Sequence, residues 1–389
     1  MSRVTVKPEI LRWARERADR SVESLRVRFP KYEQWERGEA APTLKQLEAF
    51  AKATYVPMGY LFLPQPPEER IPIPDLRTVA NRELEQPSPN LLDTIYLCQQ
   101  RQVWYRDYAR SMGDRTQGFV GSVRRGAPIE QVAERMRRAL EFDLEARREC
   151  GTWTEALRLF IEQADDLGVL VMCSGVVGSN NQRTLDTEEF RGFALVDDYA
   201  PLVFINGADT KAGQMFTLAH ELAHIWLGES ALSDVTPAST PTQQIEIWCN
   251  RVAAEFLVPL ELFQQELPPQ EPLAEVPRLA RRFKVSTLVI LRRILDAKRV
   301  DRGTFQRAYD EELARLRARA KSRGGDFYLT LGARASKRFA RALIVSTLEG
   351  QSSFTEAFRL LGLRKMETFR DLGQRERARF ILDRGGGRA

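Results

Sequence analysis

The chain has 389 residues, 43% of them hydrophobic and 29% charged, and a formal net charge of +6. This length predicts two to four domains, and the apolar content is sufficient for real hydrophobic cores. No 18-residue apolar run and no N-terminal segment of the export type is present, which argues against membrane insertion and secretion. The four cysteines lack C-x-x-C spacing, so we expect reduced thiols in a cytoplasmic protein rather than a disulfide framework.

Charge is unevenly distributed along the chain. Residues 277–389 hold 28 Lys and Arg against 12 Asp and Glu, a net charge of +16, whereas the preceding residues carry −10. A basic region attached to an acidic body predicts either a polyanionic partner or docking between the two halves. The Arg enrichment of a GC-rich genome is an alternative that the sequence leaves open.

Residues 1–65 have the pattern of a small helical module. Positions 10–18 read Ile-Leu-x-Trp-Ala-x-Glu-Arg-Ala, and positions 35–51 read Trp-Glu-Arg-Gly-Glu and then Pro-Thr-Leu-x-x-Leu-x-x-Phe-Ala. Pro42 and Thr43 begin a helix whose apolar side chains share one face. The module resembles the Xre/Cro-type helix-turn-helix, which implies a fold derived from a DNA-binding domain.

The spacing between the apolar positions of this module is shorter than a DNA-binding helix-turn-helix requires. Leu25 and Trp35 are ten positions apart, about one helical turn fewer than the resemblance requires, and Pro30 falls where the recognition helix should begin. A shortened recognition helix cannot reach base edges along its usual length. Sequence-specific DNA binding by residues 1–65 is therefore left open.

The next two segments predict connections rather than chemistry. Residues 66–90 are proline-rich and are expected to form an extended linker. Residues 91–150 carry helical periodicity with aromatic and leucine faces, which predicts a helical connector that packs on the following domain.

Residues 151–270 are predicted to form the catalytic domain. The runs 170–172, 193–196 and 201–206 read as short strands, with a turn at 197–200, and they precede a helix that ends at Gly228. A small sheet ahead of an active-site helix is the layout of zinc peptidases. We expect the sheet edge near Val203 and Phe204 to hold a substrate as an added strand.

The only two histidines of the chain lie four residues apart, in His220-Glu221-Leu222-Ala223-His224. On a helix this spacing places both imidazoles on one face, where they can bind one metal ion. Glu221 then lies beside the water that completes the coordination of the metal. This H-E-x-x-H arrangement predicts a zinc site with Glu221 as the general base.

A third ligand must come from elsewhere, and it must be a carboxylate or a cysteine because no third histidine exists. The helix predicted over 245–258 offers Glu246 and Glu255, which point to opposite faces. Glu246 is preferred because it shares a face with small Ala253 and with Asn250, which can hydrogen-bond a ligating histidine. Glu255 is the main alternative and is more simply explained as a solvated or ion-paired residue. Cys249 and Glu229 are the remaining candidates.

These residues together carry a family resemblance. The run Phe-Thr-Leu-Ala-His-Glu-Leu-Ala-His at 216–224, followed by Glu-x-x-Cys-Asn-x-Val-Ala-x-x-x-Leu-x-Pro at 246–259, resembles the ImmA/IrrE metallopeptidases. Cys249 and Val252 replace the Ala and Phe of the family pattern. The resemblance implies a gluzincin-like site with Zn²⁺ held by His220, His224 and Glu246, and cleavage of a single repressor or antitoxin.

Two further segments follow the catalytic domain. Residues 271–300 have the spacing of a second helix-turn-helix-like segment, with Ser286 as N-cap of its second helix, and are expected to serve as scaffold. Residues 301–389 are predicted to form a basic helical region with a hinge at 324–328 and a frayed tail at 385–387.

The sequence thus predicts an α+β, mostly helical protein with a zincin-like metallopeptidase domain, containing a small sheet, flanked by helical domains. Its expected function is zinc-dependent cleavage of a repressor or antitoxin in a stress-response, mobile-element or toxin–antitoxin setting. DNA contact through the N-terminal module or the basic C-terminal region is a second expected interaction, and no membrane partner is expected. A non-catalytic DNA- or toxin-binding regulator that retains the fold is the alternative function, and an antitoxin-like partner of a toxin is a third.

Overall fold

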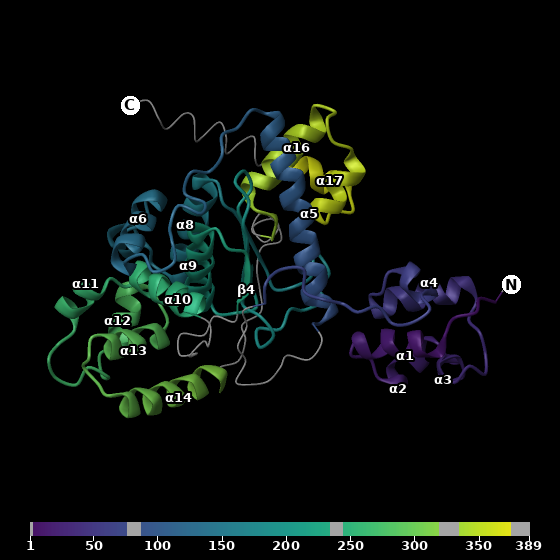
Figure 1. Cartoon of the computed structure of the whole chain (residues 1–389), viewed down its shortest axis with the longest axis horizontal. Helices are drawn as coiled ribbons and strands as arrows, with labels where there is room; N and C mark the ends of the chain where they lie inside the picture. Colours follow the sequence, from purple (N-terminus) through teal and green to yellow (C-terminus); the bar gives the residue numbers. More distant parts are fainter. Residues whose placement is uncertain (1–2, 76–86, 234–243, 319–333, 375–389) are drawn as a thin grey trace. The chain divides into compact units, whose positions relative to one another are not determined.

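The computed structural model describes residues 3–75, 87–233, 244–318 and 334–374. The chain divides into two compact units, one formed by Met1–Pro72 with Glu83–Asp93 and the other by Ile73–Arg82 with Thr94–Ala389 (Figure 1). The second unit contains a mixed four-stranded sheet among many helices, so the predicted α+β, mostly helical fold class is confirmed. The hinge expected at 324–328 and the tail at 385–387 lie outside the described residues. No described helix is both long and apolar enough to span a bilayer.

The first unit is a small helical module. Its helices are α1 (Pro8–Arg17), α2 (Val22–Arg28), α3 (Tyr32–Glu36), α4 (Leu44–Thr54) and the 3₁₀ helix η1 (Met58–Phe62). Thr43 begins α4 with a capping box that pairs it with Gln46. Tyr32 and Phe50 stack in the core with ring centroids 5.5 Å apart. The helix that follows Pro30, α3, has only five residues, and the helix-turn-helix assignment stays a prediction.

The sheet of the second unit has the strand order β1-β3-β2-β4. Its strands are β1 (Leu170–Ser174), β2 (Gly192–Leu195), β3 (Leu202–Asn206) and β4 (Ala231–Ser233). β3 pairs in parallel with β1 and antiparallel with β2, and β4 adds antiparallel to the other side of β2. β3 is therefore an inner strand. The expectation that Val203 and Phe204 form a free sheet edge is wrong, because β1 and β2 occupy both sides of their strand.

One long helix covers part of this sheet, and a second long helix packs on the first. Helix α9 (Lys211–Leu227) is capped by Thr210 and ends at Gly228, whose φ of 75° is the left-handed conformation that glycine adopts easily. It packs on β2 and β3 and lies against α10 (Gln244–Leu257), as Figure 1 shows. Every residue of α9 from Gln214 to Leu227 is buried. A helix that is enclosed on all sides positions its polar residues rigidly.

The remaining helices pack around this centre. They are α5 (Pro89–Ser111), α6 (Ile129–Leu140), α7 (Leu144–Glu149), α8 (Trp153–Leu167), α11 (Leu260–Glu266), α12 (Val276–Phe283), α13 (Thr287–Asp296) and α14 (Arg302–Ala318). Helix α6 lies on α10 and α8 lies on α9. Ser286 caps α13 as predicted, and six of the ten residues of α13 are buried. A helix enclosed in this way is not free to enter a DNA groove.

The described C-terminal residues, 334–374, form a small helical region with α16 (Lys337–Leu348) and α17 (Phe354–Leu361). Buried Asp165 of α8 accepts hydrogen bonds from the Ser336 hydroxyl, at 2.6 Å, and from the Arg338 backbone N–H, at 2.8 Å. The buried guanidinium of Arg101 on α5 donates to the carbonyl of Leu360. These bonds attach the C-terminal region to the helices beside the sheet.

Candidate metal centre

The two histidines and the glutamate between them lie in the middle of α9 and are fully enclosed. His220, Glu221 and His224 each have 0% exposed surface, and Glu246 in the first turn of α10 has 3%. Four ionisable side chains in an apolar interior require a compensating partner, because a buried charge or polar group without one is costly. The positions of these side chains relative to one another indicate that the partner is a metal ion.

The side chains of His220, His224 and Glu246 converge on one point. The Nε2 atoms of the two histidines are 3.1 Å apart. The Glu246 carboxylate brings Oε1 to 3.0 Å from Nε2 of His224 and Oε2 to 3.3 Å from Nε2 of His220. Among the described residues, this is the one cluster of three or more such side chains with the spacing to hold a metal ion.

These distances fit a tetrahedral ion. Ligand atoms about 2.0–2.1 Å from zinc in a tetrahedral site lie about 3.3 Å from one another. The two imidazole nitrogens and the two carboxylate oxygens can all donate electron pairs, so a cation between them removes a repulsion that the bare cluster would carry. Two imidazole nitrogens and one carboxylate oxygen are also a ligand set that zinc favours at catalytic sites. The residues present therefore fit the ion that the sequence predicts.

Asn250 fixes the orientation of the first histidine. Its Oδ1 lies 3.0 Å from Nδ1 of His220, which assigns the proton to Nδ1 and leaves Nε2 bare toward the cluster. Asn250 stands one helical turn after Glu246, so α10 supplies both a ligand position and the residue that orients another. Nδ1 of His224 has no partner among the described residues.

The carboxylate of Glu221 is buried without a hydrogen-bond partner among the described residues. Burial raises the pKa of Glu221 well above its usual range, and the neighbouring Glu246 carboxylate raises it further, against a smaller lowering by Ser233. Enclosed carboxyl groups of this kind are characteristic of sites that transfer protons.

The pKa of Glu246 is shifted in the opposite direction from that of Glu221. Burial would raise its pKa, but His220 and His224 outweigh burial and lower the pKa of Glu246 to about 2. The Ser233 hydroxyl at the end of β4 donates to Glu246 Oε1 at 3.5 Å. Burial lowers the pKa of His224, which favours the neutral imidazole that binds metals.

Two residues of the site were not anticipated from the sequence. Ser233 contacts Glu246, and Gly192 of β2 faces α9. A Cβ atom at Gly192 would lie 2.5 Å from Cγ2 of Thr217 and 3.2 Å from Oε1 of Glu221. Glycine in a strand signals a close approach of another group, which is the one sequence signal that could have drawn attention to this position.

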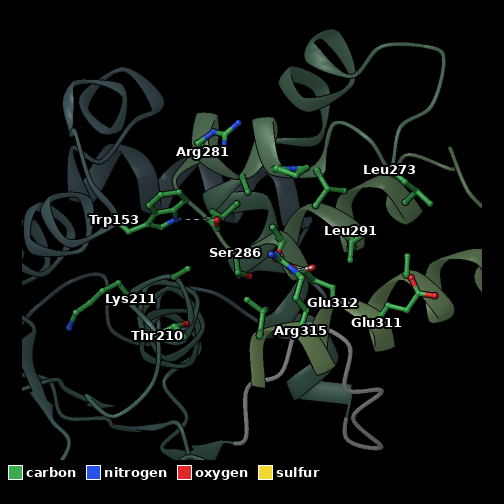
Figure 2. Close-up of a pocket in the computed structure, with 18 residues that line it drawn as sticks. Trp153, Thr210, Lys211, Leu273, Arg281, Ser286, Leu291, Glu311, Glu312 and Arg315 are labelled. Carbon is green, nitrogen blue, oxygen red and sulfur yellow. Dashed lines mark hydrogen bonds and ion pairs between the residues drawn. The ribbon is translucent and has the colours of Figure 1, made fainter. Parts of the chain in front are cut away.

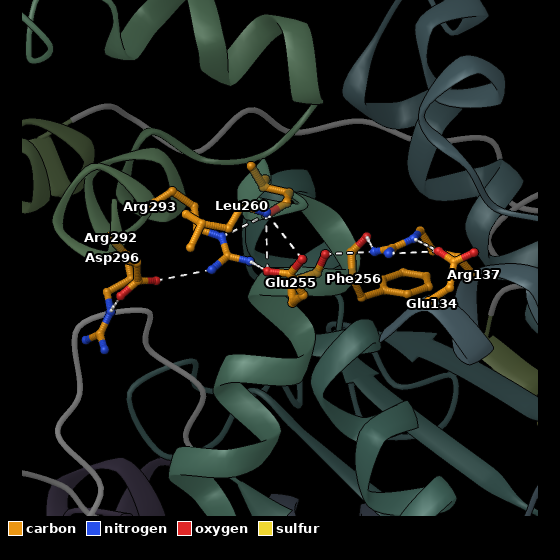
Figure 3. A network of polar contacts seen from close by, with 9 residues as sticks. Glu134, Arg137, Glu255, Phe256, Leu260, Arg292, Arg293 and Asp296 are labelled. Carbon is orange, nitrogen blue, oxygen red and sulfur yellow. Dashed lines mark hydrogen bonds and ion pairs between the residues drawn. The ribbon is translucent and has the colours of Figure 1, made fainter. Parts of the chain in front are cut away.

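Glu255 lies on the other side of α10, in a separate network (Figure 3). Its Oε2 accepts from Nη2 of Arg293 at 2.7 Å, and its carboxylate accepts the N–H of Leu260. Arg293 also pairs with Asp296. The structure thus places Glu255 in a buried ion pair between α10 and α13, away from the histidines.

Glu229 and Cys249 also lie outside the cluster. The Glu229 carboxylate pairs with the guanidinium of Arg125, at 2.6 Å. Cys249 is buried, and neither residue belongs to the group of side chains that converge for a metal ion. Glu246 is therefore the one of the four proposed third ligands that the fold brings to the two histidines.

A cavity of about 930 Å³ lies between the beginning of α9 and helices α12 to α14 (Figure 2). Trp153, Lys211, Arg281 and Arg315 are among its lining residues, and Arg315 is already paired with Glu312. None of the four central residues of the metal cluster lines it. This cavity is separate from the candidate metal centre.

Comparison with known families agrees with the geometry. Residues 164–295 match the family model of the IrrE N-terminal-like domain, an M78 peptidase family. Residues 335–375 match a domain of unknown function, DUF8813. No curated protein matches the chain. The first match spans the sheet, α9 and α10, and a metallopeptidase family implies a bound metal. Residues 164–295, about a third of the chain, are therefore similar to the IrrE N-terminal-like domain, and this similarity supports a metallopeptidase of the ImmA/IrrE type.

Proposed function

We propose that the chain is a zinc-dependent endopeptidase of the gluzincin type. His220, His224 and Glu246 would hold the ion, and Glu221 would act as the proton-transfer residue. The observation that carries the proposal is the convergence of two imidazole nitrogens and the two oxygens of one carboxylate, at 3.0–3.3 Å, beside the buried carboxylate of Glu221. When bound, zinc supplies Lewis acidity that polarises water and the scissile carbonyl.

Glu221 has the position and the environment for proton transfer. It is adjacent in sequence to His220, so the rigid helix keeps the carboxylate beside the ligands. Beside a bound cation the ionised form of Glu221 would be favoured, so its oxygens would accept a proton from the attacking water and then deliver a proton to the nitrogen of the leaving amine.

We further propose that the substrate is one regulatory protein, a repressor or antitoxin, held partly through the N-terminal module. Two features support narrow specificity: the enclosed site, and a separate helical unit available for recognition. Helix α3 is five residues long, which favours protein recognition over base reading as the role of this module. We also propose DNA contact through the basic C-terminal region.

The proposal is tested by trapping. Glu221→Gln should keep the metal and the fold while cleavage falls by several orders of magnitude, so that affinity purification retains an uncleaved partner. Glu229→Gln is a matched control, because Glu229 lies outside the cluster and pairs with Arg125. Partners are identified by mass spectrometry and then co-expressed with each variant, and their intact masses are measured. A fully zinc-loaded wild-type protein that leaves every trapped partner intact would favour the non-catalytic regulator.

A further inference from the structure

The outer side of β4 is occupied by residues from the proline-rich linker. The Leu232 N–H donates to the carbonyl of Pro74 at 2.9 Å, and Asp75 forms a parallel bridge with Leu232. Ile73 is buried, with 8% of its surface exposed. Ile73–Asp75 belongs to the same compact unit as the sheet. Ile73–Asp75 is therefore a short segment that follows a bend at Pro72 and Ile73 and places Pro74 and Asp75 beside β4.

β4 borders the metal centre. Ser233 pairs directly with Gly192 of β2. Ser233 contacts the Glu246 carboxylate, and a Cβ atom at Gly192 would lie 3.2 Å from Oε1 of Glu221. The paired residues Gly192 of β2 and Ser233 of β4 therefore lie next to the carboxylates of Glu221 and Glu246, respectively. The segment beyond β4 is the next strand position.

An extended peptide binds a sheet by adding to one of its edges. The strand order leaves two edges, on β1 and on β4. A peptide added beyond β1 would lie three strand spacings from β2, about 14–15 Å away. A peptide added to β4 would lie two strand spacings from β2, about 9–10 Å away, and one spacing from Ser233. Only the β4 edge places a substrate backbone next to the metal centre.

We propose that Ile73–Asp75 occupies the substrate position on β4, so that the linker keeps the peptidase closed until it is displaced. The inference rests on the proposed function, because it concerns access to the same site. Within the segment, Pro74 has no backbone N–H to donate, and Ile73 is the one buried side chain. An extended substrate peptide that has all of its backbone N–H donors can compete with Ile73–Asp75 for the β4 edge.

The substitution Ile73→Asp tests this, because a charge at a buried anchor should release the segment. Pro72→Asp is the matched control, since it places the same charge at an exposed neighbouring position. Hydrogen exchange at the Leu232 amide should be at least about tenfold faster in Ile73→Asp than in the wild type, and unchanged in Pro72→Asp. Ile73→Ala should change exchange in the same direction by about threefold if the aspartate variant does not fold.

The functional arm uses the full-length, zinc-loaded protein and a fluorescent extended peptide hydroxamate. Ile73→Asp should bind this probe about tenfold more tightly than wild type or Pro72→Asp. Equal affinity despite faster Leu232 exchange would overturn the inference, and so would unchanged exchange in both Ile73 variants. Failure of every zinc-loaded variant to bind the probe would instead contradict the proposed peptidase function, and the inference with it.

Discussion

Asn250 directs its side-chain oxygen at Nδ1 of His220 over 3.0 Å, from the helical turn that follows Glu246. One helix thus contributes a candidate ligand and the residue that orients another, so the approach of α10 to α9 determines the geometry of the whole cluster. Partners of this kind commonly change metal affinity by 10- to 100-fold when they are removed.

Asn250→Leu should therefore weaken zinc affinity by about 10- to 100-fold with little change in fold. The reason is that His220 loses the acceptor that fixes its proton on Nδ1. Competition with a fluorescent chelator measures the affinity. Arg251→Ala, at an exposed neighbouring position, should bind zinc like the wild type. Equal affinity in the two variants would remove Asn250 from the site.

Glu246→Gln and Glu255→Gln should have opposite effects. Glu246→Gln should lose most of the bound zinc, because a neutral amide replaces the anionic ligand. Glu255→Gln should retain zinc but lower the free energy of unfolding by roughly 2 kcal/mol, because it removes one of the two carboxylates that pair with buried Arg293. Metal analysis and denaturant unfolding separate the two results. Zinc loss in Glu255→Gln alone would move the third ligand to that residue.

Gly192→Ala should displace the Glu221 carboxylate. The added methyl group would meet Thr217 and the Phe204 carbonyl as well as Glu221, and overpacking of this kind typically costs about 1–3 kcal/mol. We expect cleavage of the trapped substrate to fall more than zinc content does. Thr217→Ser removes the nearest atom and should restore part of the activity. Gly59→Ala, where the added methyl group meets nothing within 4 Å, is the control.

Asp165 should make stability depend on pH. Burial raises its pKa from 3.8 to about 6, against smaller lowering effects of its bonds to Ser336 and Arg338. The folded state therefore favours the protonated form, and its stabilising contribution is complete below 3.8 and is lost as the pH rises through about 6.

The comparison with Asp165→Asn isolates this contribution. Between about pH 4 and pH 6.5, the wild type should lose roughly 2–3 kcal/mol of unfolding free energy relative to Asp165→Asn. Urea titrations at several pH values measure the difference. Asp166→Asn, at the exposed neighbouring position, should follow the wild type. A constant difference across this range would show that Asp165 does not titrate there.

The part of the site that could be predicted is local in sequence. His220, Glu221 and His224 share one helix, so their spacing alone fixes their relative positions. For Glu246 and Glu255, periodicity shows that they face opposite ways, but not which of the two faces points toward α9. That depends on tertiary packing, which pairs Glu255 with Arg293, 38 positions further along the chain.

The roles of Ser233, Gly192 and the linker depend on strand order, which the sequence did not reveal. β4 follows α9 in the chain but pairs with β2, while β1 pairs with β3. Treating consecutive strands as neighbours puts Val203 and Phe204 at an edge, whereas the crossover encloses them. Strand positions were predictable from apolar runs, but the pairing of strands distant in sequence was not.

The covered edge also bears on how the protein behaves at high concentration. An unprotected strand edge pairs readily with the same edge of another molecule, and proline beside such an edge blocks this pairing. With Pro74 at β4, two copies have no continuous row of backbone donors and acceptors there through which to join. Conditions that expose the edge for substrate would also expose it to other copies. The same displacement of Ile73–Asp75 that admits a substrate would thus promote aggregation. The protein with a bare β4 edge would stay soluble only while a substrate or another partner chain covers that edge.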